Sequence, residues 1–301
     1  MPIAEGDGPT RELTAQDEAY YQDAIANAES RAPAPEGSVI TERDALEAML
    51  VSSSSNHART LADWAFGSQE AFVAAAAEWL AANGLTGTTV VEPSGADPRN
   101  TSTIPDLIRI GALALADPIT AGVVAQTTAD LPDVGELTST NALLGVDGID
   151  GIKTGTLDEA GACLLFSADA VVGSRTVTLV GAVLGGPDHD AVDASVRALL
   201  ASAVAGFQEL TVPAGTAFGD YRTTWGDRAA AVTAADAALL VWGAETVTAD
   251  VALDPVTTAA SGAEVGRVVL ATAHDTATVP LVLSAALDDP GAGWRWTHPE
   301  R

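Results

Sequence analysis

The stretch that decides the fold is "DGIKTGT", residues 150–156, together with the segments that follow it. The segments "GACLLFSADAV" (161–171) and "SRTVTLVGAVLGG" (174–186) are also short, rich in β-forming residues and separated by turn residues. Such runs are typical of consecutive antiparallel strands. The segment 189–207 has helical periodicity, and we expect it to pack back on these strands.

Upstream of these strands the sequence predicts helices. Capping residues mark their starts: Thr14 with Asp17 three positions on, Thr41, and Thr103 before Pro105. The expected helices cover residues 14–31, 38–52, 56–68, 68–84 and 102–118. Helices combined with an antiparallel sheet predict an α+β fold.

The helical pattern stops after about Phe207. Residues 248–255 and 266–287 alternate with a period of two, the latter around a turn at His274-Asp275. A chain of 301 residues has room for about two domains. We therefore expect a first domain over residues 1–207 and a small all-β domain over residues 208–301.

Composition restricts the class of partner. The chain has 41 acidic against 14 basic residues, a net charge of −27, so its surface repels nucleic acid and anionic lipid. Cys163 is the single cysteine of the sequence, which excludes an intrachain disulfide. The first residues are acidic and polar, without a basic or an apolar region, and predict no signal peptide in this sequence.

Lys153 is the one lysine of the sequence. An ammonium on a half-buried strand needs a partner or a task, because burying a lone charge is unfavourable. With the Thr154 hydroxyl and the bare backbone at Gly155, Lys153 is suited to bind a carboxylate and to let a peptide pair with the strand. The alternative is a surface strand that carries this tripeptide by chance.

A second candidate is the serine run that precedes residues 56–68. Ser54 and Asn56 place a hydroxyl and an amide one residue apart, a pair that can pass a proton and hold a peptide carbonyl. The alternative is a helix-capping loop, because Ser and Asn are favoured there. We expect Ser52, Ser53 and Ser55 to be structural.

These two segments resemble one known family. "LVSSSSNHARTLADW" (50–64) and "GIKTGTLDEAGACLLFSA" (151–168) look like the penicillin-binding D-alanyl-D-alanine carboxypeptidases of serine peptidase family S11. That class carries S-x-x-K, S-x-N and K-T-G motifs. Ser54-x-Asn56 matches the second and Lys153-Thr154-Gly155 the third. Residues 100–110 and 138–155 resemble the family between the motifs, and the end of the chain resembles its β-rich C-terminal domain.

The resemblance implies a penicillin-binding, β-lactamase-like transpeptidase fold and a hydrolase that removes the terminal D-alanine of peptidoglycan stem peptides through an acyl-serine. Lys153 and Thr154 would bind the terminal carboxylate, Ser54 would relay a proton, Asn56 would hold the peptide, and Thr156 would offer its N–H to an oxyanion hole. No metal or other cofactor is expected. The partners implied are peptides ending in D-Ala-D-Ala and, for a full-length form, β-lactams, outside the cytoplasm.

One motif of the family has no counterpart here. Because Lys153 is the single lysine and Asp150 lies three residues before it, S-x-x-K is absent from the sequence. We therefore expect an N-terminally shortened version of the family's domain, inactive as given. The alternative is a non-catalytic protein that binds peptidoglycan peptides.

Overall fold

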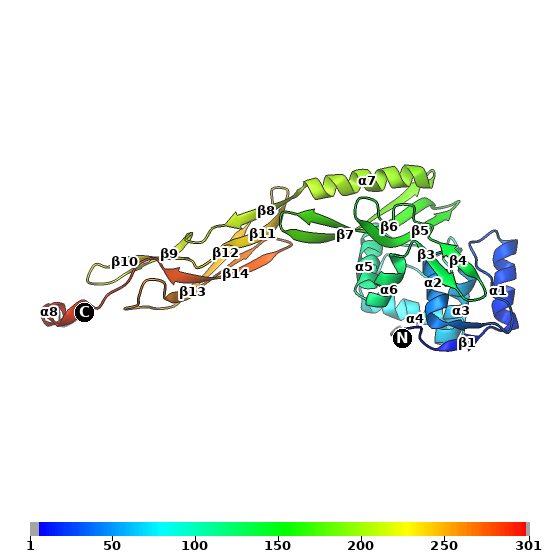
Figure 1. Ribbon diagram of the computed structural model, residues 1–301, viewed down its shortest axis with the longest axis horizontal. Coiled ribbons are helices and arrows are strands. Elements are labelled where there is room, and N and C mark those ends of the chain that lie inside the picture. Colours follow the sequence, from blue (N-terminus) through cyan, green and yellow to red (C-terminus); the bar gives the residue numbers. More distant parts are fainter. Residues whose placement is uncertain (1–5, 299–301) are drawn as a thin grey trace. The chain divides into compact units, whose positions relative to one another are not determined.

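The computed structural model describes residues 6–298 (Figure 1) and divides into two compact units. Unit 1 comprises the residues up to Ala170 and Thr176–Ala201, and unit 2 comprises Val171–Arg175 and the residues from Ser202. The signal-peptide expectation rests partly on residues 1–5, and these residues and residues 299–301 lie outside the described range.

Helices dominate the first part of the chain. They are α1 (Ala15–Ala26), α2 (Glu42–Leu50), α3 (Ser55–Phe66), α4 (Gln69–Ala82), α5 (Ile104–Leu115), α6 (Pro118–Val124) and α7 (His189–Ala205). All the helices expected from the sequence are present, and α6 is an addition.

The expected caps are present as well. Thr14 donates both its N–H and its hydroxyl to the carboxylate of Asp17, while Thr41 and Thr103 accept at their hydroxyls from the third residue of α2 and α5. These contacts satisfy backbone and side-chain groups at the helix start, which is why capping residues mark the boundary so well.

Two small antiparallel pairs were not predicted from the sequence. Strands β1 (Thr10–Glu12) and β2 (Val39–Thr41) pair with each other, and so do β3 (Thr128–Leu131) and β4 (Gly135–Thr138). Strands of three or four residues are too short to show periodicity, so only their pairing reveals them.

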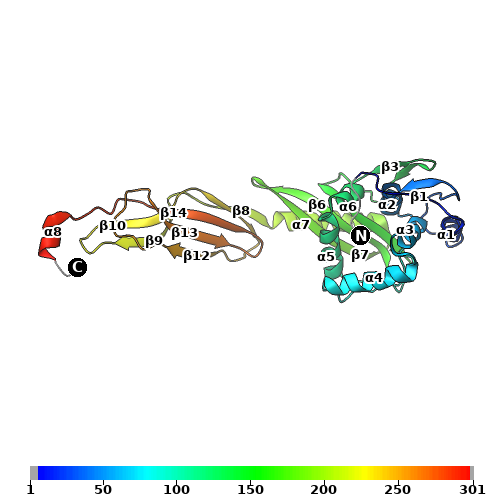
Figure 2. The same ribbon diagram turned by 90° about the horizontal axis from the view of Figure 1, so that it is seen from below.

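The central sheet of unit 1 has the order β5-β6-β7, with β5 (Ile149–Leu157), β6 (Gly161–Val172) and β7 (Arg175–Gly186). These are the three consecutive strands expected from the sequence, and β5 pairs antiparallel with β6 in a register that sets Lys153 opposite Leu165. Helices α5 and α7 lie on opposite faces of this sheet (Figures 1 and 2). Gly111 lets α5 approach closely, since a Cβ there would lie 2.9 Å from Ile152 Cδ1.

Unit 2 is mainly β. Its strands are β8 (Phe207–Val212), β9 (Ala217–Arg222), β10 (Arg228–Thr233), β11 (Ala237–Trp242), β12 (Thr248–Leu253), β13 (Glu264–Ala271) and β14 (Thr276–Leu283). They form a five-stranded sheet, β12-β13-β14-β10-β9, and a pair, β11-β8. The expected turn at His274-Asp275 joins β13 to β14. The expectation that helices end after Phe207 was wrong in one detail, because α8 (Gly291–Thr297) follows the last strand.

In the part of the chain that the structure describes, no single helix is long and apolar enough to cross a membrane. Helices α5 and α6 pass that test together by length and composition, but they are bent by 108° relative to each other.

Candidate functional site

The two segments singled out in the sequence meet in space. Lys153 lies on β5 and Ser53 lies in the loop between α2 and α3, one hundred residues apart along the chain. The Lys153 ammonium donates a hydrogen bond to Ser53 Oγ, and it also lies 3.2 Å from the backbone oxygen of Thr154. Both side chains are partly exposed. The helix-to-helix loop and the sheet are therefore joined by this pair.

Two threonines extend the contact. Thr140 Oγ1 lies 3.2 Å from Ser53 Oγ and 2.5 Å from Thr154 Oγ1. Thr140 precedes β5, so the loop, the segment before the strand and the strand itself all contribute. We call Ser53, Thr140, Lys153 and Thr154 the outer cluster. Its ammonium and three hydroxyls form a chain of contacts that runs from Lys153 through Ser53 and Thr140 to Thr154.

Burial perturbs the lysine of the outer cluster. Desolvation lowers the pKa of Lys153 to about 8, because the partly buried ammonium has lost part of the water that stabilises its charged form. An amine with such a pKa holds a proton near neutral pH yet releases it far more readily than an ordinary lysine. Lys153 can thus supply positive charge to a ligand and also exchange a proton with it.

The strand edge beside the outer cluster is open. Among the described strands β5 pairs only with β6, which leaves its other edge without a strand partner. A Cβ built at Gly155 would meet no atom within 4 Å. Further along β5, Thr156 Oγ1 lies 2.8 Å from His189 Nε2 at the start of α7. An extended ligand can approach the backbone here and meet hydroxyl and imidazole groups.

Ser54 and Asn56 lie elsewhere. Ser54 is 1% exposed and Asn56 is fully buried. Ser54 Oγ accepts from the N–H of Ala32 at 3.0 Å and donates to Asn56 Oδ1 at 2.8 Å, while Asn56 Nδ2 donates to the oxygen of Ala32 at 3.0 Å. The structure therefore does not bring these two side chains to Lys153; Ser53 lies there instead.

His57 completes this second, interior group. Its Nδ1 lies 2.8 Å from Ser54 Oγ, and the side chain is fully buried. Burial lowers the pKa of His57 to about 4, although the carboxylate of Asp17 opposes that shift. The imidazole is thus neutral at ordinary pH. We call Ser54, Asn56 and His57 the inner cluster.

Sequence reasoning missed Ser53, Thr140 and His57. Ser53 was set aside because S-x-N spacing selects Ser54, and within four consecutive serines spacing is the sole guide. Thr140 sits in an irregular segment with no motif of its own. For His57 there was a weak signal, a histidine next to Asn56 at the start of an apolar helix.

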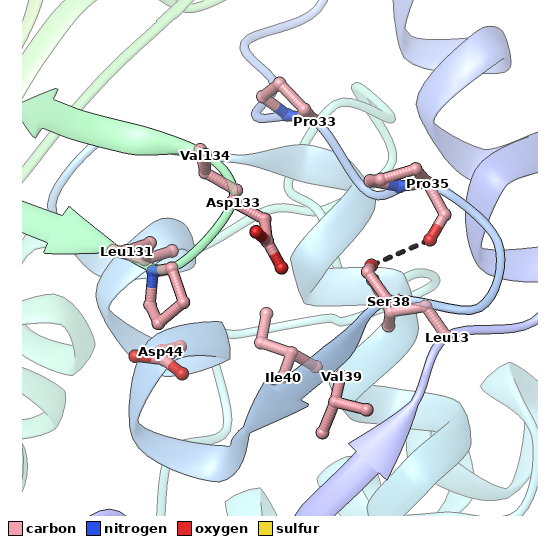
Figure 3. Close-up of a pocket in the computed structure, with 11 residues that line it drawn as sticks. Leu13, Pro33, Pro35, Ser38, Val39, Ile40, Asp44, Leu131, Asp133 and Val134 are labelled. Atoms are coloured by element: carbon pink, nitrogen blue, oxygen red, sulfur yellow. Dashed lines mark hydrogen bonds between the residues drawn. The ribbon is translucent and has the colours of Figure 1, made fainter.

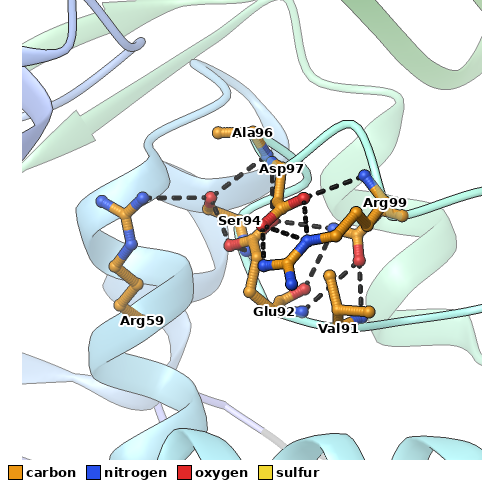
Figure 4. A network of polar contacts seen from close by, with 8 residues as sticks. Arg59, Val91, Glu92, Ser94, Ala96, Asp97 and Arg99 are labelled. Carbon is orange, nitrogen blue, oxygen red and sulfur yellow. Dashed lines mark hydrogen bonds and ion pairs between the residues drawn. The ribbon is translucent and has the colours of Figure 1, made fainter.

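Two cavities in the described part of the chain are lined by residues outside both clusters. A small one is lined by Leu13, Pro33, Pro35, Ser38, Val39, Ile40, Asp44 and residues 131–134 (Figure 3). A cavity of about 430 Å³ is lined by Glu29, Arg59, Gln69, Glu92 and residues 96–98. Beside it, Glu92 accepts from the N–H and the hydroxyl of Ser94, in a network that also contains Arg59 and Arg99 (Figure 4).

Within residues 6–298, no group of three or more His, Cys, Asp or Glu side chains is arranged to hold a metal ion.

Comparison with solved structures identifies the fold. The chain is similar to penicillin-binding protein 5 from Haemophilus influenzae, with 22% identity over 93% of this chain and 83% of that one and a TM-score of 0.64. It is similar to a peptidoglycan synthesis regulatory factor, PBP3, from Streptococcus pneumoniae, with 20% identity over 93% and 85% and a TM-score of 0.64. The D-alanyl-D-alanine carboxypeptidase DacD from Francisella tularensis matches with 16% identity over 95% and 90% and a TM-score of 0.56.

These similarities confirm the expected fold class, a penicillin-binding-protein-like α+β fold with a β-rich C-terminal part. No curated protein matches the chain. The family model described as D-alanyl-D-alanine carboxypeptidase matches residues 9–187, more than half of the sequence and a range that includes both clusters. The chain therefore belongs to the D-alanyl-D-alanine carboxypeptidase family of serine peptidases.

Proposed function

We propose that this chain recognises peptidoglycan stem peptides ending in D-Ala-D-Ala, as the peptide-binding part of a serine-type carboxypeptidase. One observation carries the proposal: the Lys153 ammonium and Ser53 Oγ are in contact beside an open edge of β5. The contact joins two segments that match the family and lie one hundred residues apart.

Each group of the outer cluster has a task in this proposal. The terminal carboxylate of the peptide accepts hydrogen bonds from the Lys153 ammonium and the Thr154 hydroxyl, and a charge-assisted bond of this kind is about twice as strong as a neutral one. The peptide backbone pairs with the free edge of β5, as an added strand. Gly155 leaves room for that approach.

Proton transfer to the departing D-alanine is assigned to Ser53, in place of the role first given to Ser54. Ser53 Oγ donates its proton to the leaving amine and recovers one from the Lys153 ammonium, whose pKa of about 8 makes it a stronger acid than an ordinary lysine although it is mainly protonated at neutral pH. Thr140 Oγ1 lies within hydrogen-bonding distance of both the Ser53 and the Thr154 hydroxyl and so links them.

The acyl-serine step requires a further Ser-Lys pair. We propose that a segment outside these 301 residues supplies it, on a helix that covers α5. Supporting this, α5 is apolar, yet in the described part of the chain Gly111 is its single buried residue and Ile104 is 44% exposed. The complete enzyme would act outside the cytoplasm, where its substrate lies.

Peptide binding tests the proposal directly. Nζ-¹⁵N, Cε-¹³C lysine labelling reports on Lys153 alone, because the sequence has no other lysine. Titration with diacetyl-L-Lys-D-Ala-D-Ala is expected to move this signal with saturation. The C-terminal amide of the same peptide should bind at least tenfold more weakly, since it cannot accept the charge-assisted bonds.

Two variants separate site binding from the effect of net charge. Because Lys153→Met carries no lysine signal, isothermal titration calorimetry measures the affinity of both variants. Lys153→Met removes the ammonium and should abolish binding, whereas Arg267→Met removes a positive charge from the exposed face of β13 and should leave affinity unchanged. Equal binding of the acid and the amide peptide, or wild-type affinity in the Lys153→Met variant, would overturn the proposal.

Intact-mass spectrometry after incubation with a β-lactam tests the origin of the nucleophile. No adduct is expected on the 301-residue chain, because the acylating pair is not in it. A stable one-to-one adduct would show that a serine of this chain is nucleophilic and would refute the outside segment.

A further inference from the structure

The loop between α2 and α3 holds Ser53 in an unusual conformation. Its φ of +60° lies in the left-handed region, which residues other than glycine adopt at a cost of about 1–3 kcal/mol. Such a conformation persists only where its surroundings fix it. The question is therefore what fixes Ser53 with its hydroxyl toward Lys153.

Backbone hydrogen bonds anchor the residues that follow. The Ser54 N–H donates to Ala48 O at 3.0 Å and the Ser55 N–H donates to Ser30 O at 2.8 Å. These bonds place the end of the loop, but they would be compatible with several side-chain directions. The four consecutive serines carry identical side chains, so their chemistry alone does not determine which of them faces Lys153.

The hydrogen bonds of the inner cluster fix Ser54 as the serine whose side chain points into the interior. Ser54 Oγ is held by three partners at once: the Ala32 N–H, Asn56 Oδ1 and His57 Nδ1. The Ser54 hydroxyl has one proton, which it donates to Asn56 Oδ1, and one hydrogen of Asn56 Nδ2 goes to the Ala32 oxygen. His57 Nδ1 lies 2.8 Å from Ser54 Oγ and 3.2 Å from Asn56 Nδ2. Because Nε2 is buried without a partner among the described residues, the tautomer with the hydrogen on Nδ1 is favoured, and Nδ1 then donates to the nearer atom, Ser54 Oγ.

This proton arrangement requires neutral His57 with its hydrogen on Nδ1. The Nε2 atom then carries a lone pair and is buried without a hydrogen-bond partner among the described residues. A bare buried acceptor is tolerated more easily than a bare N–H. The charged form, which would bury an unpaired N–H and a charge, is disfavoured, in agreement with the lowered pKa.

We propose that His57 is a positioning residue for the outer cluster: by clamping Ser54 inward it turns the adjacent Ser53 outward, against Lys153. This inference rests on the proposed role of the outer cluster in peptide recognition. His57 itself touches no ligand. Its action passes through Ser54 and the backbone of the loop.

The proposed role of His57 is tested by the pKa of Lys153, which is measured by titrating the lysine signal in the protein without peptide. His57→Gln removes the donor at the Nδ1 position and should raise the Lys153 pKa by about one unit or more, because a released Ser53 lets water reach the ammonium. His57→Asn places an amide N–H where Nδ1 stood and should keep the wild-type value.

Two further variants make the result decisive. Thr60 lies on α3, like His57, and donates a buried 2.8 Å hydrogen bond to Asp17 on α1. Thr60→Val breaks that bond without changing the loop and should leave the Lys153 pKa unchanged. Ser54→Ala removes the clamped hydroxyl itself and should reproduce the rise, and it serves in place of His57→Gln if that variant does not fold.

The inference is overturned if His57→Gln and Ser54→Ala leave the Lys153 pKa at its wild-type value, or if Thr60→Val shifts it equally. Failure of the proposed function would look different. In that case the wild-type protein would not bind the D-Ala-D-Ala peptide, but the Lys153 pKa would still rise in the His57→Gln and Ser54→Ala variants. If the clamp exists and recognition is correct, His57→Gln also weakens peptide binding at least fivefold and His57→Asn does not.

Discussion

At the scale of single residues, two adjacent serines have opposite environments. Ser53 faces Lys153 and Thr140, whereas Ser54 is 1% exposed and bonded to Asn56 and His57. The sequence predicted that the serine run and Lys153 belong to one site. It could not select the serine, because that depends on the φ of Ser53 and on a histidine that the motif does not contain.

The buried histidine should make stability depend on pH. The pKa of His57 is about 4 in the folded protein because of burial, against 6.5 for the free side chain. Between these values the unfolded chain binds a proton that the folded protein does not, so stability falls as the pH falls from 6.5 to 4. The full difference amounts to roughly 3 kcal/mol.

Urea denaturation at several pH values between 7.5 and 4 measures this effect. His57→Asn is the control, since it lacks the titrating group, and its stability should decline less over the same range. The nearby Asp17, which is paired with Arg11 and has a pKa lowered by hydrogen bonds that outweigh its burial, is common to both proteins and cancels in the difference. If the stabilities of the wild type and of His57→Asn depend on pH in the same way, the lowered pKa of His57 is not the cause of the loss of stability.

At the scale of elements, helix boundaries were predictable and short strands were not. The caps at Thr41 and Thr103 act locally, through contacts within three residues, and the sequence shows them. Strands β1 to β4 exist only through their partners. The sheet β5-β6-β7 was predictable because it is a meander of long, consecutive strands.

A glycine at the entry to β5 makes this sheet possible. Gly148 has a φ of +82°, and a Cβ there would lie 2.2 Å from the backbone oxygen of Asp169. Gly148→Ala should therefore destabilise the protein by more than about 3 kcal/mol, since a backbone clash adds to the conformational strain.

Gly145 separates these two contributions. It has a φ of +78°, but a Cβ there would meet nothing within 4 Å, so Gly145→Ala should lower the free energy of unfolding by only about 1 kcal/mol. Chemical denaturation measures the free energy of unfolding of both variants. Equal losses would mean that strain alone, without the clash at Asp169, determines the effect.

At the scale of the whole molecule, each unit has its own organisation. In unit 2, a core of buried aliphatic residues that includes Leu239, Val268 and Leu281 lies within the β-rich part. The domain boundary expected at residue 207 stays a prediction. Unit 1 carries both clusters, so the proposed peptide recognition belongs to this unit.

The acidity of the chain should also act on the whole molecule. With a net charge of −27, the folded state suffers self-repulsion that salt screens, because the Debye length falls from ~30 Å at 0.01 M to ~10 Å at 0.1 M. The melting temperature should therefore rise by several degrees between 0.01 M and 0.3 M NaCl. KCl should act equally, whereas a flat or falling melting temperature would contradict the repulsion.

The sequence by itself determined the α+β class, the main helices and the order of β5 to β7, because periodicity and capping act over short stretches of chain. The resemblance of two segments indicated the family, which the family model confirms. Lys153 as the chemical centre of the site stays a prediction. Only the tertiary structure decided that Ser53 and Thr140, rather than Ser54 and Asn56, lie against Lys153. The reason is physical: the direction of a side chain in a loop is set by buried hydrogen bonds to residues far away in sequence, here through Ala32 and His57.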